Sequence, residues 1–465
     1  MTAALRDAPA VAPRRQAPLT LDDGSRIAVI GCGPAGSLFA YFALELAERI
    51  GISLHIDIYE PRDFAVPGPQ GCNMCGGIIS ESLVQNLASE RISLTDGVVQ
   101  RGIDSYFLHM DVGSVRIDTP LREMRIGAVH RGAGPKTATE RRWESFDHYM
   151  QQYPLGRGAH LVHARVEEVR RENDRVTIKA RDREPEAYDL VTVAVGVNSP
   201  ILKLFEGLGI GYERPKVTKT LIREYRLGQD VISRTLGSSM HVFLLNIPRL
   251  EFAAIIPKGD FVTMCLLGDD IDNAMVDAFV ASPEVRNCMP PEWNPADRAC
   301  QCLPHINVGG VDKPFADRFL FIGDAGVTRL YKDGIGAAYR TAKAAARAAV
   351  LEGISEEAFR RHYLPACRRI SQDNLIGRLA FLFTRGVQHA GLLRRAVLRM
   401  TIEEQGKDGP HRRLSGVLWD MFSGSAPYRD IFVRMLHPAF MGRFLWSIGV
   451  AAVRGSAPRA GEARP

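Results

Sequence analysis

The chain has 465 residues, of which 46% are hydrophobic, and a net charge of +6. This length exceeds that of one ordinary domain and allows two interleaved domains with a buried core. No window reaches the ~18–20 apolar residues of a membrane-spanning helix, and the N-terminus lacks the charged-then-apolar order of a signal peptide, so we expect a cytoplasmic protein. The charge is uneven, because residues 352–465 hold 18 lysines and arginines against 10 aspartates and glutamates. This basic segment therefore carries +8 and the rest of the chain −2.

The eight cysteines include two close pairs, Cys72–Cys75 and Cys300–Cys302. Reduced or redox-active thiols fit this usage better than the disulfide framework of a small secreted protein. Residues 1–24, rich in Ala, Pro and Arg, and residues 456–465 are predicted to be disordered tails.

The first structured segment is a βαβ unit. A β-branched run over Arg26–Gly31 ends in glycine, an apolar-periodic helix covers Pro34–Ile50, and a second strand covers Leu54–Glu60. Pro and Gly residues then predict a loop over Pro61–Gly77, followed by a helix over Ser80–Leu87.

Strand-like patterns dominate the middle of the chain. Residues 98–131 and 216–268 alternate in short strands and hairpins. The sequence also predicts a helix over Glu144–Gln152 and strands over Leu161–Val169, Val176–Ala180, Leu190–Val195 and Phe319–Gly323. An alanine-rich helix over Gly336–Val350 follows, and the pattern is helical from there to about Val453.

A glycine loop lies between the first strand and the first helix, with the sequence Gly31-Cys32-Gly33-Pro34-Ala35-Gly36. Gly31 permits a tight turn, Gly33 lets backbone approach a pyrophosphate, and Gly36 allows helix and strand to pack closely, while the helix N-terminus offers free N–H groups. Glu60 ends the next strand, where its carboxylate can accept hydrogen bonds from the adenosine ribose. Together these features predict a dinucleotide site, and a glycine turn without a ligand is the alternative.

A second motif far downstream favours FAD over NAD. A buried strand delivers Gly323-Asp324, and Gly334-Ile335-Gly336 then opens a helix. Asp324 can bind ribityl hydroxyls, and the helix N-terminus can stabilise negative charge on a flavin ring; an aspartate that only caps a helix is the alternative. No second glycine fingerprint follows another strand. We therefore expect FAD as the built-in cofactor, with electrons supplied by transiently bound NAD(P)H or by a partner protein.

These motifs resemble those of the geranylgeranyl reductase-like branch of the FAD-dependent hydroxylase and reductase superfamily, over about residues 26–350. Three further segments carry the resemblance: Cys75–Ser80 (CGGIIS), Asp189–Ser199 (DLVTVAVGVNS) and Phe252–Gly259 (FAAIIPKG). The resemblance implies that Cys75 lies beside the flavin. It also implies that Arg142, which precedes Phe146–Asp147, is similar to a flavin-contacting arginine of relatives.

The chain also departs from the family pattern. An aspartate that aromatic hydroxylases place near both flavin and nicotinamide is Val195 here, which disfavours a hydroxylase cycle with NADPH. Ala254 and Ile256 stand where bulky substrate-lining rings are usual. Arg329–Lys332 (RLYK) replaces a usual proline and brings cations and a phenol close to the expected isoalloxazine ring.

The Cys72–Cys75 pair allows three interpretations. The thiols can form a reversible disulfide that relays electrons, Cys75 can line the pocket or help protonate a substrate carbon, or both are buried structural cysteines. Cys300 and Cys302 could approach the same flavin face, and a zinc or iron–sulfur site built from both pairs is a further alternative. We predict catalytic roles for Cys75 and Cys72, and no metal.

The C-terminal helices, over Asn374–Met400 and Arg429–Val453, place Phe, Leu, Met and Trp446 among arginines. A basic amphipathic helix can lie on an anionic membrane surface, which would make the protein peripheral on the inner face of the membrane. A helical cap packed on the flavin domain shows the same spacing, so both alternatives stay open.

We therefore predict an α/β fold, α+β overall: a three-layer Rossmann-like FAD-binding domain, an inserted β-rich substrate domain and a helical C-terminal region. The FAD-binding domain comprises residues 25–97, 132–200 and 300–350. The substrate domain comprises residues 98–131 and 201–299, and the helical C-terminal region comprises residues 351–455. The leading hypothesis is a reductase that passes hydride from FAD to an apolar, prenyl- or lipid-like double bond. The rival is an electron-transfer flavoprotein that serves a partner such as a lipoyl-assembly or iron–sulfur enzyme, and a flavin monooxygenase comes third. Nucleic acid is not expected as a partner.

Overall fold

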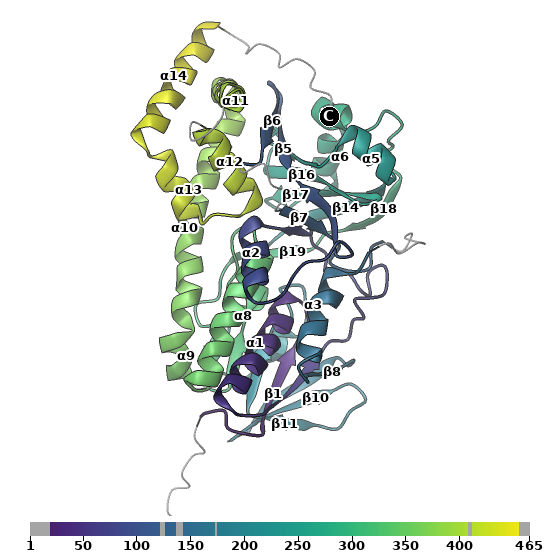
Figure 1. Ribbon diagram of the computed structural model, residues 1–465, viewed down its shortest axis with the longest axis vertical. Helices are drawn as coiled ribbons and strands as arrows, with labels where there is room; N and C mark the ends of the chain where they lie inside the picture. The colour runs from purple at the N-terminus through teal and green to yellow at the C-terminus, as the bar shows by residue number, and fades with distance from the viewer. Residues whose placement is uncertain (1–18, 121–125, 136–142, 173, 408–411, 455–465) are drawn as a thin grey trace, which may run out of the picture.

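The computed structural model describes residues 19–120, 126–135, 143–172, 174–407 and 412–454. The molecule is elongated (Figure 1). One sheet surrounds β1 (Ser25–Ile30) at one end, and a second sheet contains β16 (Leu250–Lys258) at the other. Helices α9 (Glu356–His362) to α14 (Pro438–Arg454) follow one long side.

The first sheet is six-stranded and mostly parallel. Its order is β20 (Phe315–Ala316), β21 (Phe319–Phe321), β12 (Leu190–Val193), β1, β2 (Leu54–Tyr59) and β8 (His160–Val162). Only the β20–β21 pair is antiparallel. Strands covered on both faces form continuous apolar runs, and β12 accordingly has all four of its residues buried.

Two different layers cover this sheet. One face packs against α1 (Pro34–Ile50), α3 (Phe146–Leu155) and α8 (Gly334–Leu351). The other face packs against an antiparallel sheet of β9 (Val166–Arg171), β10 (Val176–Ala180) and β11 (Glu186–Tyr188). The three-layer α/β architecture predicted from the sequence is therefore confirmed.

The second sheet has seven strands. Its order is β18 (Arg298–Cys302), β14 (Leu221–Arg226), β17 (Phe261–Gly268), β16, β15 (Ser239–Phe243), β5 (Ser105–Met110) and β6 (Gly113–Asp118). All pairs are antiparallel except β15–β5. One face packs against α5 (Gln229–Thr235), α6 (Asn273–Ala281) and α7 (Pro283–Cys288).

Shorter elements connect the two sheets. Strands β3 (Ile78–Ile79), β7 (Ile126–Val129) and β4 (Val99–Ile103) form one small sheet, and β13 (Lys216–Lys219) pairs with β19 (His305–Gly309). The remaining helices of this part are α2 (Glu81–Ser89) and α4 (Leu202–Glu206). Helix α2 begins where predicted, because the Ser80 hydroxyl accepts a hydrogen bond from the Leu83 N–H at 3.3 Å.

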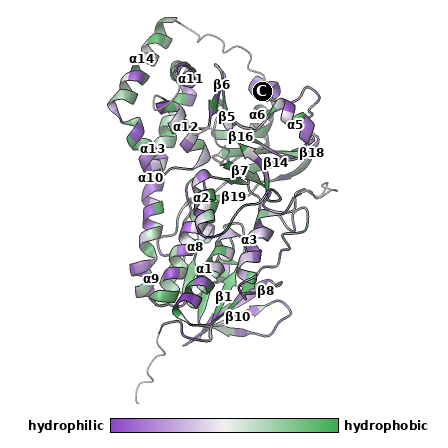
Figure 2. Cartoon of the chain, viewed as in Figure 1, coloured by the Kyte–Doolittle hydropathy of each residue, from purple (hydrophilic) through white to green (hydrophobic). Residues whose placement is uncertain are grey.

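The C-terminal helices cover the other face of the seven-stranded sheet. They are α10 (Leu364–His389), α11 (Gly391–Gln405), α12 (Arg413–Ser423), α13 (Tyr428–Met435) and α14, whereas α9 packs against α8 and β20 beside the first sheet. Helix α10 links the two ends of the molecule and is mostly hydrophilic, in contrast to the hydrophobic β1 (Figure 2). In the described part of the chain no single helix has the length and apolarity to cross a membrane; α13 and α14 pass that test only as a pair bent by 65°.

Two sequence expectations need correction. The strand predicted over Leu161–Val169 is two strands, β8 and β9, because the chain leaves the parallel sheet at Ala164 and joins the antiparallel one. The boundary at residue 300 is also wrong: residues 300–302 belong to β18, whose hydrogen bonds go to β14 in the second sheet. The other domain boundaries stay predictions.

Candidate functional site

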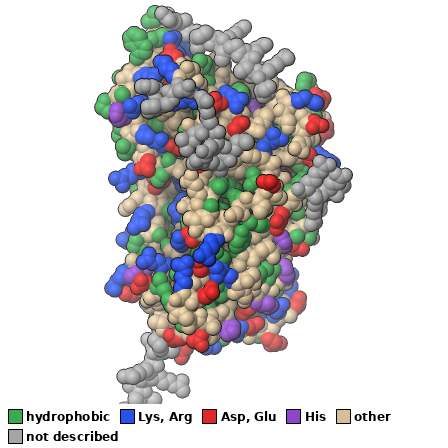
Figure 3. Space-filling view, in the orientation of Figure 1, with side chains coloured by type: hydrophobic (Ala, Val, Ile, Leu, Met, Phe, Trp, Pro, Cys, Tyr) green, Lys and Arg blue, Asp and Glu red, His purple; other side chains and the backbone are tan. Residues whose placement is uncertain are grey.

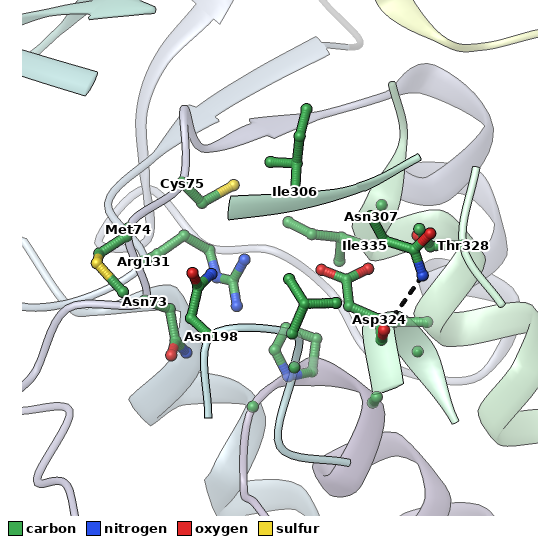
Figure 4. Close-up of a pocket in the computed structure, with 18 of the residues that line it drawn as sticks. Asn73, Met74, Cys75, Arg131, Asn198, Ile306, Asn307, Asp324, Thr328 and Ile335 are labelled. Atoms are coloured by element: carbon green, nitrogen blue, oxygen red, sulfur yellow. Dashed lines mark hydrogen bonds between the residues drawn. The ribbon is translucent and has the colours of Figure 1, made fainter. Parts of the chain in front are cut away.

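One continuous cavity of about 560 Å³ runs between the two sheets. At one end it meets the loops that follow β1, β2, β12 and β21, and at the other it meets the face of the seven-stranded sheet. Figure 4 shows side chains from both sides of the cavity, with Arg131, Asn198 and Asp324 pointing into it. Ligands of open parallel sheets bind at the carboxyl ends of the strands, which is where this cavity begins.

The glycine loop forms one wall of the cavity. Gly31 has φ of +100°, and a Cβ on it would lie 2.8 Å from the carbonyl O of Ala194. A Cβ on Gly36 would lie 1.9 Å from the carbonyl O of Gly31. Gly33 and Pro34 line the cavity, as does Ala35, whereas Gly36 lies behind it and acts through packing. No side chain caps α1, so its first N–H groups stay available to an anion.

Glu60 is fixed to this loop. Its buried carboxylate accepts hydrogen bonds from the Cys32 N–H at 3.0 Å and from Nε of Arg62 at 3.1 Å. Arg62 also donates to the carbonyl O of Cys72 at 3.3 Å. Both side chains line the cavity. A carboxylate oriented in this way can still accept hydrogen bonds from ribose hydroxyls.

The second motif lies on the opposite wall. A 3₁₀ turn over Gly323–Ala325 follows β21 and places the Asp324 carboxyl in the cavity. Burial raises the pKa of Asp324, while the charge of Arg131 acts in the opposite direction. Nδ2 of Asn307 donates to the backbone O of Asp324 at 3.2 Å (Figure 4).

The start of α8 completes this wall. Gly334 and Ile335 line the cavity, and Gly336 instead abuts the Asp333 carboxylate. Asp333 accepts hydrogen bonds from the Ser80 hydroxyl at 3.1 Å and from Arg340 at 3.0 Å. The helix N-terminus is thereby held at the cavity edge.

Arg131, on the loop after β7, is one of the arginines that line the cavity. Its Nε lies 2.8 Å from Oδ2 of Asp147, which is fully buried at the start of α3. Burial alone would lower the pKa of Arg131, but Asp147 and the Cys75 thiol raise it above its ordinary value. Arg142, which the sequence analysis chose for this role, lies outside the described residues.

The distance along the chain explains why the sequence analysis missed Arg131. It stands sixteen residues before Asp147, whereas Arg142 stands only five residues before it. One signal was available: a buried acid in a helix's first turn needs a cation, and Arg131 follows a fully buried strand.

Cys72 and Cys75 both line the cavity as free thiols. The Cys75 sulfur points into the cavity (Figure 4) and accepts a hydrogen bond from the Gly77 N–H at 3.4 Å. Cys72 accepts one from the Met74 N–H at 3.2 Å, and burial raises its pKa. Within the described residues no group of three or more His, Cys, Asp or Glu side chains could hold a metal ion.

The far end of the cavity is lined by side chains that the strand register of the second sheet brings together. We call this end the apolar chamber. Across the sheet, Cys302, Ile222, Cys265 and Ala254 stand opposite one another on β18, β14, β17 and β16. The last three line the cavity, together with further apolar side chains: Met240, Phe252, Ile256 and Leu267. Burial raises the pKa of Cys265 and Cys302 to about 12, so both thiols stay protonated at neutral pH.

Lys332 faces the chamber from the loop before α8. Its Nζ lies 4.0 Å from the centroid of the Phe252 ring. Burial lowers its pKa to about 7, and the positive charge of Arg329 acts in the same direction. Tyr331, in the same loop, adopts a positive φ of +58°, a costly conformation for a bulky residue. The motif pattern predicts these side chains near a flavin, but it predicts no role for Lys332.

These features define a class of protein. A parallel sheet holds a pyrophosphate-type loop at one strand end and an aspartate at another, and both face one cavity that ends in an apolar chamber. Such a protein can hold an extended dinucleotide across the sheet with one end presented to the chamber.

No protein-family model and no curated protein matches the sequence. The fold is similar to that of a geranylgeranyl bacteriochlorophyll reductase-like protein from Thermoplasma acidophilum, with a TM-score of 0.61 and 16% identity over 93% of this chain and 99% of that one. It is also similar to a flavoprotein/dehydrogenase from Cytophaga hutchinsonii (TM-score 0.57, 13% identity, 92% and 100% covered). A variant of the halogenase PltM in complex with FAD is a further neighbour (TM-score 0.56, 13% identity, 94% and 93% covered). The chain therefore has the fold of FAD-dependent oxidoreductases, as predicted.

Proposed function

We propose that the protein is an FAD-dependent oxidoreductase that reduces a carbon–carbon double bond of an apolar, prenyl- or lipid-like substrate. One observation carries the proposal: the cavity runs unbroken from the glycine loop to a chamber walled by apolar side chains of the second sheet. A cofactor held at the loop would therefore meet a substrate that lies among apolar side chains.

The residues of the cavity fit FAD. The uncapped start of α1 and the space that only glycine leaves at Gly31 suit a pyrophosphate. Glu60 suits the adenosine ribose, Asp324 the ribityl chain, and the start of α8 at Gly334 the flavin ring. Arg131 is the arginine we propose beside the ring, in the role first given to Arg142.

A bound flavin supplies hydride to a substrate carbon, and the protein must then supply a proton to the neighbouring carbon. Lys332 holds a proton on Nζ at the chamber wall, and a group with a pKa near 7 both holds and releases it at neutral pH. The Cys75 thiol points into the cavity at the flavin end and is the second candidate for this role. The apolar residues orient the substrate and exclude water. Transiently bound NAD(P)H is the proposed electron donor.

Anaerobic reoxidation tests this function. The full chain is loaded with FAD, reduced without oxygen and mixed with a geranylgeranyl-type alkene, with the saturated analogue as control. We expect the alkene alone to restore the oxidised flavin absorbance. Reoxidation and product formation that occur only with oxygen would favour a monooxygenase and contradict the proposal.

The second candidate is an electron-transfer flavoprotein that serves a protein partner. It is favoured by Cys300, which is exposed on the edge strand β18 two residues from Cys302. Burial raises the pKa of its neighbour Cys302 to about 12, which disfavours rapid thiol exchange between the two thiols. If a protein acceptor but no alkene reoxidises the reduced flavin, and Cys300→Ser abolishes this, the second candidate replaces the first.

A further inference from the structure

An unpartnered apolar surface lies on the C-terminal helices. We call it the C-terminal apolar face and define it by Leu379 and Leu382 on α10, Leu436 after α13, and Leu445, Trp446 and Val453 on α14. Trp446 is 71% exposed, and the chain's other three tryptophans are buried. Figure 3 shows hydrophobic side chains beside Lys and Arg at the end of the molecule where Figure 1 places α14. Large exposed apolar patches mark interaction sites.

Helix α14 is apolar on two opposite sides. Phe440, Phe444 and Ala451 are buried against the rest of the helical region, and Phe444 contacts Phe383 of α10 with ring centroids 6.0 Å apart. Leu445 and Trp446 face outward from the same turns. A helix that is apolar all round is normally covered on all sides, so its outward side is expected to meet another apolar phase.

The charge around the C-terminal apolar face indicates which kind of apolar surface covers it. Helix α14 contains arginines but no acidic residue, and the segment 352–465 carries a net charge of +8. In the described part of the chain, neither Arg429 nor Arg443 forms an ion pair. Arginines next to exposed leucine and tryptophan side chains match an anionic lipid surface, where the apolar groups enter the acyl region and the cations meet phosphates.

The geometry of α13 and α14 suits helices that lie on a membrane surface and not helices that span the membrane. Helices α13 and α14 are bent by 65° to one another, and one side of α14 is occupied by protein contacts. We therefore propose that the C-terminal apolar face docks on an anionic lipid bilayer, with α10, α13 and α14 lying along its surface.

This docking would bring the bilayer close to the apolar chamber. Phe381 on the inward side of α10 packs against Tyr331 and Phe252 of the cavity wall, with ring centroids 5.0 and 6.3 Å apart. The next residue, Leu382, is 64% exposed on the outward side. Helix α10 alone thus separates the apolar chamber from the C-terminal apolar face at this point. The proposal rests on the surface itself and does not require the proposed reduction reaction.

Vesicle binding tests the proposal. The full chain is mixed with vesicles of phosphatidylcholine, with and without phosphatidylglycerol, and floated on a density gradient. We expect flotation with the anionic vesicles and its loss at high salt. Tryptophan emission should shift to the blue and be quenched by brominated lipid, and the Trp446→Phe variant should bind without showing this signal.

Matched charge insertions locate the surface. The double variant Leu445→Glu with Trp446→Glu should reduce vesicle binding by about tenfold or more. The control is Ile50→Glu with Val217→Glu, which changes two exposed apolar residues elsewhere and should bind as the wild type does. Equal thermal unfolding of both variants shows that the fold is kept.

Two outcomes would overturn the proposal. One is that the Leu445→Glu and Trp446→Glu variant floats as the unmodified chain does. The other is that the unmodified chain does not bind anionic vesicles and sediments as a dimer that this same variant converts to a monomer, since a second copy of the chain would then cover the face.

Discussion

The two ends of the cavity are built in different ways. At the glycine loop, short contiguous stretches supply the wall, and what matters is the backbone: Gly31 and Gly36 are needed because a Cβ would collide with a carbonyl. At the apolar chamber, the wall is made of side chains from four strands and a loop, brought together by register. Backbone requirements limit the sequence strongly, whereas a chamber tolerates many side chains of similar volume. The glycine loop can therefore be recognised from a single sequence, whereas the apolar chamber cannot.

The largest effect is expected at the glycine loop. In Gly36→Ala the new Cβ would lie 1.9 Å from the carbonyl O of Gly31, which forces α1 away from β1. We expect FAD affinity to fall by roughly a hundredfold or more, equal to about 3 kcal/mol. The measurement is the flavin absorbance retained per chain after dialysis.

Gly416→Ala is the matched control, because a Cβ there meets nothing within 4 Å. It should retain FAD as the unmodified chain does. Equal flavin content in Gly36→Ala would show that the loop does not hold the cofactor.

The next effect concerns the buried ion pair between Arg131 and Asp147. Arg131→Met leaves the Asp147 carboxylate buried without its partner, and such losses cost about 3–5 kcal/mol. Urea unfolding should show this decrease in stability, and adding Asp147→Leu should restore most of it. Arg170→Met, which removes an exposed ion pair with Glu168, should leave the unfolding midpoint nearly unchanged.

If Arg131→Met unfolds at the same urea concentration as the unmodified chain, the Arg131–Asp147 ion pair does not stabilise the fold. The account of Arg131 as the arginine of the site would then be wrong.

At the chamber end, Lys332→Met should lower turnover by about a hundredfold while FAD stays bound. The pKa of Lys332 is lowered to about 7, so Nζ holds its proton below that pH and loses it above. Turnover of the unmodified enzyme should therefore fall as the pH rises through about 7. The Lys332→Met variant should lack this fall, and Lys203→Met on the exposed side of α4 should keep it.

A pH profile that is unchanged in Lys332→Met would exclude Lys332 as the proton donor. Cys75 would then be the remaining candidate among the groups proposed here.

The smallest effect is expected for the thiols. Cys75→Ser replaces a thiol that points into the cavity and should lower turnover by about tenfold. Cys72→Ser should stay within about twofold, because burial raises the pKa of that thiol and keeps it protonated. Turnover and the flavin spectrum are measured together. Full turnover in Cys75→Ser would remove the thiol from the mechanism.

The sequence predicted the parts of the molecule that local rules determine. The glycine loop, Glu60 and the Gly323–Asp324 turn follow strand and helix patterns within a few residues, and the structure places all of them on the cavity. The three-layer fold follows from the same alternation of strands and helices.

The parts that the sequence did not predict depend on distant contacts. The choice of Arg142 followed sequence proximity, and the structure pairs Asp147 with Arg131 instead. The proposed role of Lys332 depends on its burial against Phe252, which lies on β16. The placement of β18 in the second sheet depends on its pairing with β14. None of these contacts leaves a periodic signal in the chain.

The product formed from a prenyl alkene tests most directly the central claim, which is that the protein reduces a carbon–carbon double bond. The FAD-loaded chain is incubated with NAD(P)H and a prenyl alkene in heavy water, and the product is analysed by mass spectrometry. The account predicts a product that gains two hydrogen atoms across the double bond, one of them a deuterium from solvent. A product that gains an oxygen atom, or an alkene that is recovered unchanged while the flavin turns over, would contradict it.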